Sequence, residues 1–274
     1  MSLRKAVYWS IFWVALSLLF NGGVFYFLGK QKAIEFLTGY VIEKSLSVDN
    51  LFVFLIIFTL FDIQPHNQRR VLNYGIIGVL LLRGILILLG SALVQEFSWI
   101  LYLFGAFLFY TGYKMVFGKE KKINYENNIV VRWLKKIFPF DSTYDGVHFF
   151  TKKEHVIHAT PLFLTLVIIE TTDVIFAVDS IPAIFAITTD PFIVLTSNIM
   201  AVLGLRSMYF VLVHIQKIFI YVRYGVGVVL GFVGAKMLAA DVVHINTVFS
   251  LAIVMGVLTI SVILSYFKQS RSIN

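Results

Sequence analysis

The sequence of 274 residues contains no cysteine and few charged residues. Without cysteine, the chain cannot form disulfides, thiolate metal sites or cysteine-based redox centres of its own. Charged residues make up 14% of the chain, whereas a soluble domain of this size would carry about a quarter. Hydrophobic residues make up 59%, and the mean hydropathy is +0.86. This composition predicts an all-α, polytopic membrane protein that forms a single transmembrane domain over residues 1–274.

Eight stretches of the chain are long and apolar enough to span a bilayer, which takes about 20 residues each. They are residues 6–28, 34–61, 71–93, 97–117, 158–187, 193–215, 219–240 and 245–267. With eight spans, one face carries only two basic residues outside the spans, Lys30 and Lys32, while most of the others fall on the face that holds both termini. The positive-inside rule then predicts cytoplasmic termini in the inner membrane. The net charge is +8, and we expect the basic residues to contact anionic lipid headgroups and not nucleic acid.

The longest connection between spans, residues 118–156, is predicted to lie in the cytoplasm. It contains apolar residues at helical spacing with basic residues on the other side: Val130, Trp133, Leu134 and Ile137 against Arg132, Lys135 and Lys136. This pattern favours an amphipathic helix on the membrane surface, although an ordinary solvated loop remains an alternative. The sequence leaves open a homodimer, or a partner protein bound through this loop.

The two halves of the chain resemble each other. Three ordered markers match at similar spacing when one half is aligned with the other: Glu43, Asp49 and Asn50 with Asp173, Asp179 and Ser180, then Arg83 with Arg206, then Lys114 with Lys236. We interpret residues 34–117 and 158–240 as two three-helix repeats, with 6–28 and 245–267 as flanking helices. An odd number of spans inverts the second copy. Transporters of that design bind their substrate near the midplane, between the repeats.

Acidic residues inside both repeats carry the functional prediction. Carboxylates at membrane depth are costly and usually mark a polar pathway or a binding site. The two matched triplets, Glu43, Asp49 and Asn50 with Asp173, Asp179 and Ser180, supply carboxylate, amide and hydroxyl oxygens. Such ligands suit hard divalent ions, namely Mn²⁺, Ca²⁺ or Mg²⁺. Residues placed to relay protons or to complete the site are Glu170, Ser47, Lys44, Arg83 and Arg206.

Two points about these acids remain open in the sequence. The acids could instead form ion pairs with Lys44, Arg83 and Arg206 inside the bundle and bind no metal. In addition, Asp49 and Asp179 lie about 120° from their partner acids on an ideal helix. Either the helices unwind there, which Pro182 would favour, or the acids face different neighbours.

The motifs Glu43–Asn50 and Asp173–Ala183 resemble the two signature motifs of the TerC family of bacterial integral membrane proteins. The stretch from Ala159 to Met208 is similar to the Alx branch of that family, which is linked to the LysE-type exporters. The resemblance implies manganese efflux, metal loading of exported enzymes or tellurite resistance, with the matched triplets as the metal site. Alx-like relatives usually carry a further N-terminal span, so its absence here would leave the N-terminus cytoplasmic.

From these observations we expect a transporter that exports a divalent cation, with Mn²⁺ as the bound or transported ion. The alternative from another functional class is a membrane scaffold that assists metalation of enzymes, or resistance to tellurite and redox stress, with a structural metal. Export of an amino acid is a third hypothesis, which rests on distant analogy alone.

Overall fold

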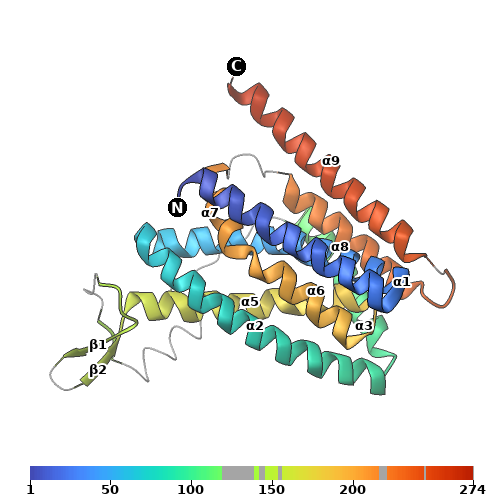
Figure 1. Cartoon of the computed structure of the whole chain (residues 1–274), viewed down its shortest axis with the longest axis horizontal. Helices are drawn as coiled ribbons and strands as arrows, with labels where there is room; N and C mark the ends of the chain where they lie inside the picture. Colours follow the sequence, from blue (N-terminus) through green and yellow to red (C-terminus); the bar gives the residue numbers. More distant parts are fainter. Residues whose placement is uncertain (119–138, 142–145, 154–155, 216–220, 244, 274) are drawn as a thin grey trace.

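In the computed structural model, the described residues are 1–118, 139–141, 146–153, 156–215, 221–243 and 245–273. The side chains of Asp49, Leu60, Lys153, Ile215 and 269–273 also lie outside this description. The helices form an elongated bundle, and a small β-hairpin projects from one end of it (Figure 1). We call this the hairpin end and the opposite end the far end.

The described part of the chain is nearly all α-helical, as predicted. Its helices are α1 (Leu3–Leu60), α2 (Pro65–Glu96), α3 (Ile100–Phe117), α5 (Pro161–Phe185), α6 (Pro191–Leu203), α7 (Leu205–Ile215), α8 (Val222–Leu238) and α9 (Thr247–Ile273). Among the described residues, α1, α2, α3, α5 and α9 are long and apolar enough to cross a membrane, and the bent pair α6 and α7 makes a sixth if it forms one span. The predicted number of eight spans stays a prediction.

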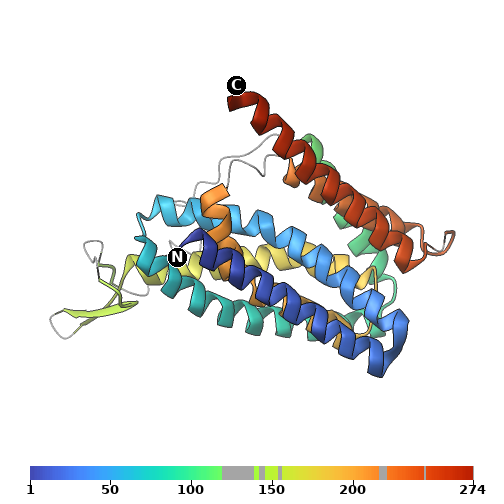
Figure 2. The ribbon, with the colours of Figure 1, turned by 45° about the horizontal axis from the view of Figure 1, so that its top comes forward.

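Helix α1 covers two of the predicted spans. Its backbone breaks at Gly29, whose φ of 87° and ψ of 172° are not helical. A positive φ is readily adopted by glycine alone, so the chain can reverse here. The two halves, 3–28 and 30–60, then run back alongside each other (Figure 2). They are joined by apolar contacts such as Phe20 against Phe36, with ring centroids 5.4 Å apart.

The start of the fifth predicted span was wrong by a few residues. We predicted helix from residue 158, but the structure has an antiparallel hairpin of β1 (Phe150–Lys153) and β2 (Val156–Ala159) before α5. The helix begins at Pro161, with the Thr160 hydroxyl accepting a hydrogen bond from the Phe163 N–H at 3.4 Å. Proline at the first position and threonine as N-cap define this start. The predicted amphipathic helix at 130–137 lies outside the described residues.

Two further irregularities concern the second half of the chain. Helix α5 continues through Pro182 to Phe185, so of the two alternatives for Asp179 the structure shows different neighbours and not an unwound helix. The proline lies in the last turn, where it interrupts little of the helix. The sixth predicted span is instead the one that breaks, because α6 ends at Leu203 and α7 begins at Leu205 with a bend of 42°.

Helices α3 and α8 approach each other through glycines. A Cβ added at Gly234 would lie 2.6 Å from the Gly105 carbonyl oxygen and 3.0 Å from the Phe109 Cα. A Cβ at Gly112 would lie 2.5 Å from the Gly227 carbonyl oxygen. The two backbones are therefore in van der Waals contact, as small residues allow in membrane bundles.

Two glycines one turn apart in α8 provide a test of this contact. We expect Gly234→Ala to lower the melting temperature of the detergent-solubilised protein, because overpacking costs about 1–3 kcal/mol. Gly231→Ala is the matched control, since a Cβ there meets nothing within 4 Å. Alanine in a helix gains roughly 0.5–1 kcal/mol over glycine, so the control should melt at the wild-type temperature or higher. Equal melting temperatures for the two variants would contradict the close contact.

Candidate functional site

The centre of the bundle contains a buried cluster organised by Arg83 of α2. Its Nε donates to Asp173 Oδ2 and its Nη2 to Asp173 Oδ1, both at 2.8 Å. Its Nη1 donates to a Glu43 carboxylate oxygen and, at 3.0 Å, to Asn198 Oδ1. Arg83, Glu43 and Asp173 are each at most 3% exposed at the side chain. One guanidinium thus joins two carboxylates that come from the second half of α1 and from α5.

Two further polar groups donate hydrogen bonds to the Glu43 carboxylate. The Ser47 hydroxyl donates to Glu43 Oε1 at 3.0 Å, and the Asn198 amide donates to Glu43 Oε2 at 3.4 Å. Ser47 lies one turn after Glu43 on α1, and Asn198 comes from α6. Four elements, α1, α2, α5 and α6, therefore meet at this cluster. With two carboxylates and one guanidinium, its formal charge is −1.

The structure brings together only part of the predicted site. Glu43 and Asp173 share Arg83, which is the ion-paired arrangement that the sequence left open as an alternative. Asp179 instead faces α3, where its Oδ1 accepts a hydrogen bond from the Thr111 hydroxyl at 3.3 Å. The Asp49 side chain lies outside the described residues. Within the residues that are described, no group of three or more acidic or histidine side chains is arranged to hold a metal.

Of the other predicted residues whose side chains the structure describes, only Ser47 hydrogen-bonds to this cluster, and the rest occupy separate positions. Asn50 and Ser180 are buried at 2% and 1% exposure, and the Ser180 hydroxyl has no hydrogen-bond partner among the described residues. Arg206 is partly buried and donates to Asn73 of α2. Glu170 lies on the α5 face that packs against α2, and its carboxyl group is close to Gly78.

Lys44 interacts with the broken span. Its ammonium group donates to the Ala201 carbonyl oxygen at 2.9 Å, just before α6 ends. A positive charge is favourable at a helix C-terminus because of the helix dipole. Among the described side chains, Lys44 is also the only charged one that lines a cavity of about 570 Å³ between the two halves of α1 and α7.

Sequence reasoning did not assign Asn198 to the site. An amide between the apolar residues of the sixth predicted span was a signal that could have found it, since such side chains bond across helices. The partner of Asn198 could not be identified in this way, because residues 43 and 198 are far apart in the chain and their approach depends on tertiary packing.

A second polar network lies at the far end. Lys32 forms ion pairs with Glu35 Oε2 at 3.3 Å and with Asp190 Oδ2 at 2.9 Å. Asp190 also caps α6 by accepting from the Phe192 N–H at 3.0 Å. Partial burial tends to raise the pKa of Asp190, but Lys32 and the backbone donors outweigh it and hold this pKa below its ordinary value. The pair therefore persists at neutral pH and is lost only as the pH falls through that lowered pKa.

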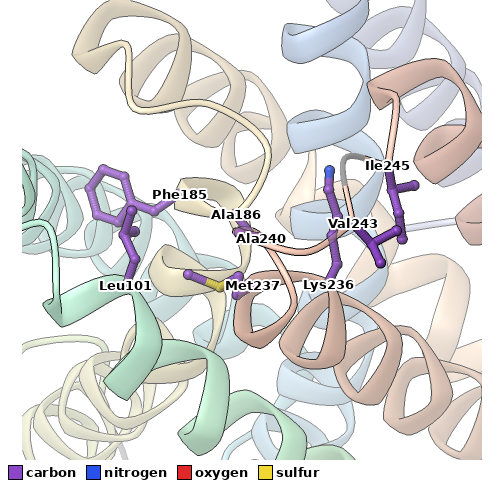
Figure 3. Close-up of a pocket in the computed structure, with 8 residues that line it drawn as sticks. All are labelled: Leu101, Phe185, Ala186, Lys236, Met237, Ala240, Val243 and Ile245. Atoms are coloured by element: carbon purple, nitrogen blue, oxygen red, sulfur yellow. The ribbon is translucent and has the colours of Figure 1, made fainter.

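A smaller pocket of about 190 Å³ lies between α3, α8 and the end of α5. Figure 3 shows Lys236 on the opposite side of the pocket from Phe185 and Leu101. The residues that line this pocket include no acid, so it offers no carboxylate to a cation.

Comparisons with known proteins agree with the membrane architecture. The model of the Integral membrane protein TerC family matches residues 28–272. A Salmonella typhi protein with the provisional name membrane-bound redox modulator Alx is 49% identical, over 97% of this chain and 85% of its own length. The Escherichia coli K12 protein of the same name is 48% identical over 99% and 87%. The Arabidopsis thaliana thylakoid membrane protein TERC is 43% identical over 94% and 67%. No solved structure matches the chain.

The pairing around Arg83 predicts a large effect of its removal. We expect Arg83→Leu to destabilise the folded protein by about 3–5 kcal/mol, because two buried carboxylates lose their counter-charge. Thermal unfolding in detergent, followed by loss of helical circular dichroism, measures the change. Combining Arg83→Leu with Glu43→Gln and Asp173→Asn should recover part of the loss. Arg206→Leu, at a partly buried site with one hydrogen bond to Asn73, should have a smaller effect. Unfolding of Arg83→Leu at the wild-type temperature would refute this assignment.

Proposed function

Because the chain belongs to the TerC family of integral membrane proteins, we propose that it exports a divalent metal cation across the membrane. Mn²⁺ is the foremost candidate, and Ca²⁺ and Mg²⁺ are the other hard ions that oxygen ligands would accept. The proposed path runs through the buried cluster of Glu43 and Asp173.

The observation that carries this proposal is the convergence of Glu43 and Asp173, from different helices, on a single positive group. Two carboxylates so close together at membrane depth need a cation between them. Arg83 fills that role in this structure. The same carboxylates, with the Asn198 carbonyl oxygen and the Ser47 hydroxyl, present oxygen ligands of the kind that hard ions prefer.

An ion could enter this cluster only if Arg83 moved away from the carboxylates. We propose that transport is an exchange of cations, in which the metal ion takes the place of the guanidinium. The Arg83-paired form would then be the ion-free form of the site. In such a cycle the arginine prevents the empty site from holding two uncompensated carboxylates, whose burial would be costly.

We propose further that the chain has eight spans, six of which form two inverted repeats. It would lie in the inner membrane of a bacterium, with both termini in the cytoplasm. The packing supports the repeats, because each pair of elements matched by the repeat is in contact: α1 with α5, α2 with α6 and α7, and α3 with α8. The two halves of α1 would be separate spans, and α8 would be another. The hairpin end would face the cytoplasm.

A second candidate function is a membrane scaffold that assists metalation of enzymes or resistance to redox stress. One observation favours it: the hairpin extends beyond the helices (Figure 1) and exposes Val156 and Ile157, at 48% and 58%. The close relatives' name, redox modulator, is compatible with such a role. A redox function in this chain would not use thiols, because it contains no cysteine.

Reconstitution into liposomes tests the transport proposal. We expect Mn²⁺ flux with the wild-type protein, and a loss of roughly tenfold or more with Glu43→Gln or Asp173→Asn, because each variant removes an anionic ligand of the ion. A metal-sensitive dye inside the liposomes reports the flux. Glu96→Gln is the control, since Glu96 is an exposed carboxylate at the end of α2. Absence of flux for Mn²⁺, Ca²⁺ and Mg²⁺ with correctly folded wild-type protein would rule out the proposal, and binding of a partner by the hairpin would then favour the scaffold.

A further inference from the structure

Glu170 lies in a recess formed by two glycines of α2. A Cβ added at Gly75 would be 3.6 Å from Glu170 Oε1, and one added at Gly78 would be only 2.6 Å from Oε2 and 2.5 Å from Cδ. Any residue larger than glycine at position 78 would therefore collide with the carboxyl group. The recess places Glu170 on the α2 face of α5, three residues before Asp173 and nearer the hairpin end.

Both carboxyl oxygens of Glu170 are shielded from solvent and have no hydrogen-bond partner among the described residues. Three cationic side chains of the helices that pack against α5 are engaged elsewhere. Arg83 of α2 binds Glu43 and Asp173, Lys44 of α1 donates to Ala201, and Lys114 of α3 lies near Asp179. The charged group that does act on Glu170 is Asp173, which repels a second negative charge.

This environment favours a neutral carboxyl group. An ionised carboxylate that is buried without a donor is expensive, more so at membrane depth and beside a like charge. The neutral form adds no charge to the Arg83 cluster, whose formal charge stays at −1. An ionised Glu170 would bring the charge of the enlarged cluster to −2.

We propose that Glu170 is the proton-binding site that couples proton movement to cation export. This inference rests on the proposed transport function and identifies its coupling group. In the Arg83-paired form, Glu170 holds a proton. When a divalent ion displaces Arg83 from Glu43 and Asp173, the Glu170 O–H bond breaks, the proton leaves toward the hairpin end, and the carboxylate becomes a partner for the released guanidinium.

The step raises the summed charge of the cluster by one unit, through the gain of a divalent ion and the loss of a proton. Before it, Glu43, Asp173, Arg83 and protonated Glu170 sum to −1. Afterwards, the divalent ion adds two positive charges and the lost proton removes one, so the sum is 0. Arg83 and Gly78 lie on the same helix, about 7.5 Å apart along its axis at ~1.5 Å per residue. Asp173 and Glu170 are three residues apart on α5 and both face α2, so the guanidinium would transfer between two acceptors on the same face of α5.

The principal test compares wild-type protein with Glu170→Gln in liposomes that carry a pH gradient. A pH-sensitive dye and a metal-sensitive dye follow protons and Mn²⁺ together. With the wild-type protein, we expect Mn²⁺ flux to respond to the gradient and to be accompanied by opposite proton movement. With Glu170→Gln, which mimics the protonated form, we expect no proton movement and no response to the gradient, and calorimetric Mn²⁺ binding weaker than wild type by roughly tenfold or more, because the displaced guanidinium finds no carboxylate to pair with. Glu170→Asp should restore part of the response.

Three results would overturn the inference, and they differ from failure of the transport proposal. Wild-type Mn²⁺ flux without proton movement would leave the transport function intact and remove the coupling. A gradient response retained by Glu170→Gln would show that another group carries the proton. Mn²⁺ binding of wild-type strength in folded Glu170→Gln would show that the displaced guanidinium does not depend on Glu170. Absence of any wild-type flux would remove the transport function, and the coupling with it.

A pair of glycine variants tests the recess itself without altering the carboxyl group. Gly78→Ala should displace the Glu170 carboxyl group and shift the pH profile of Mn²⁺ flux relative to wild type. Gly84→Ala on the same helix is the matched control, since a Cβ there meets nothing within 4 Å, and its profile should be unchanged. Identical profiles for both variants would overturn the role of the recess. If Gly78→Ala does not fold, the Glu170 variants still decide the question.

Discussion

Ionised side chains buried in an apolar bundle have to be paired, and the pairing of Glu43 and Asp173 through Arg83 is the interaction on which the centre of this protein depends. The guanidinium donates from Nε, Nη1 and Nη2, so its planar geometry fixes the positions of both carboxylates and of Asn198. Through that one side chain, α1, α2, α5 and α6 are held in a defined arrangement. A lysine at this position would provide one point charge without the same geometry.

The same pairing explains why the cluster is suited to exchange. A carboxylate pair compensated by a tethered cation can accept a free cation only in place of the tethered one, because the guanidinium already occupies the carboxylate oxygens that would bind the ion. Lys44 occupies a comparable position at the end of α6, where it binds the Ala201 carbonyl oxygen beside the break between α6 and α7.

Different forces hold the rest of the bundle. Helices α3 and α8 are joined by backbone contact at glycines, which leaves little room for relative displacement. The elements around Arg83 are joined by ion pairs, and the charged groups of an ion pair can exchange partners. The far-end ion pair of Lys32 with Asp190 likewise joins α1 to the start of α6 through side chains. In the transport cycle that we propose, movement is therefore expected among α1, α2, α5 and α6, with α3 and α8 moving together.

The sequence by itself determined the class of the protein. The scarcity of charge and the length of the apolar runs require a bilayer, and the acidic motifs carry the likeness to the TerC family. Helix positions followed closely from the apolar runs. The hairpin at Phe150–Ala159 did not, because short apolar stretches such as Val156–Ala159 suit a strand as well as the start of a helix.

Tertiary structure alone decided which groups meet. Helical periodicity places Glu43 and Ser47 on one face, but the rotation of each helix and its neighbours depend on packing against the whole bundle. For that reason Asp179 faces Thr111 of α3, while Asp173, six residues earlier, faces Arg83. The same packing brings Asn198 to Glu43 and presses Glu170 against Gly78, contacts between residues that are distant in the chain and that no local pattern encodes.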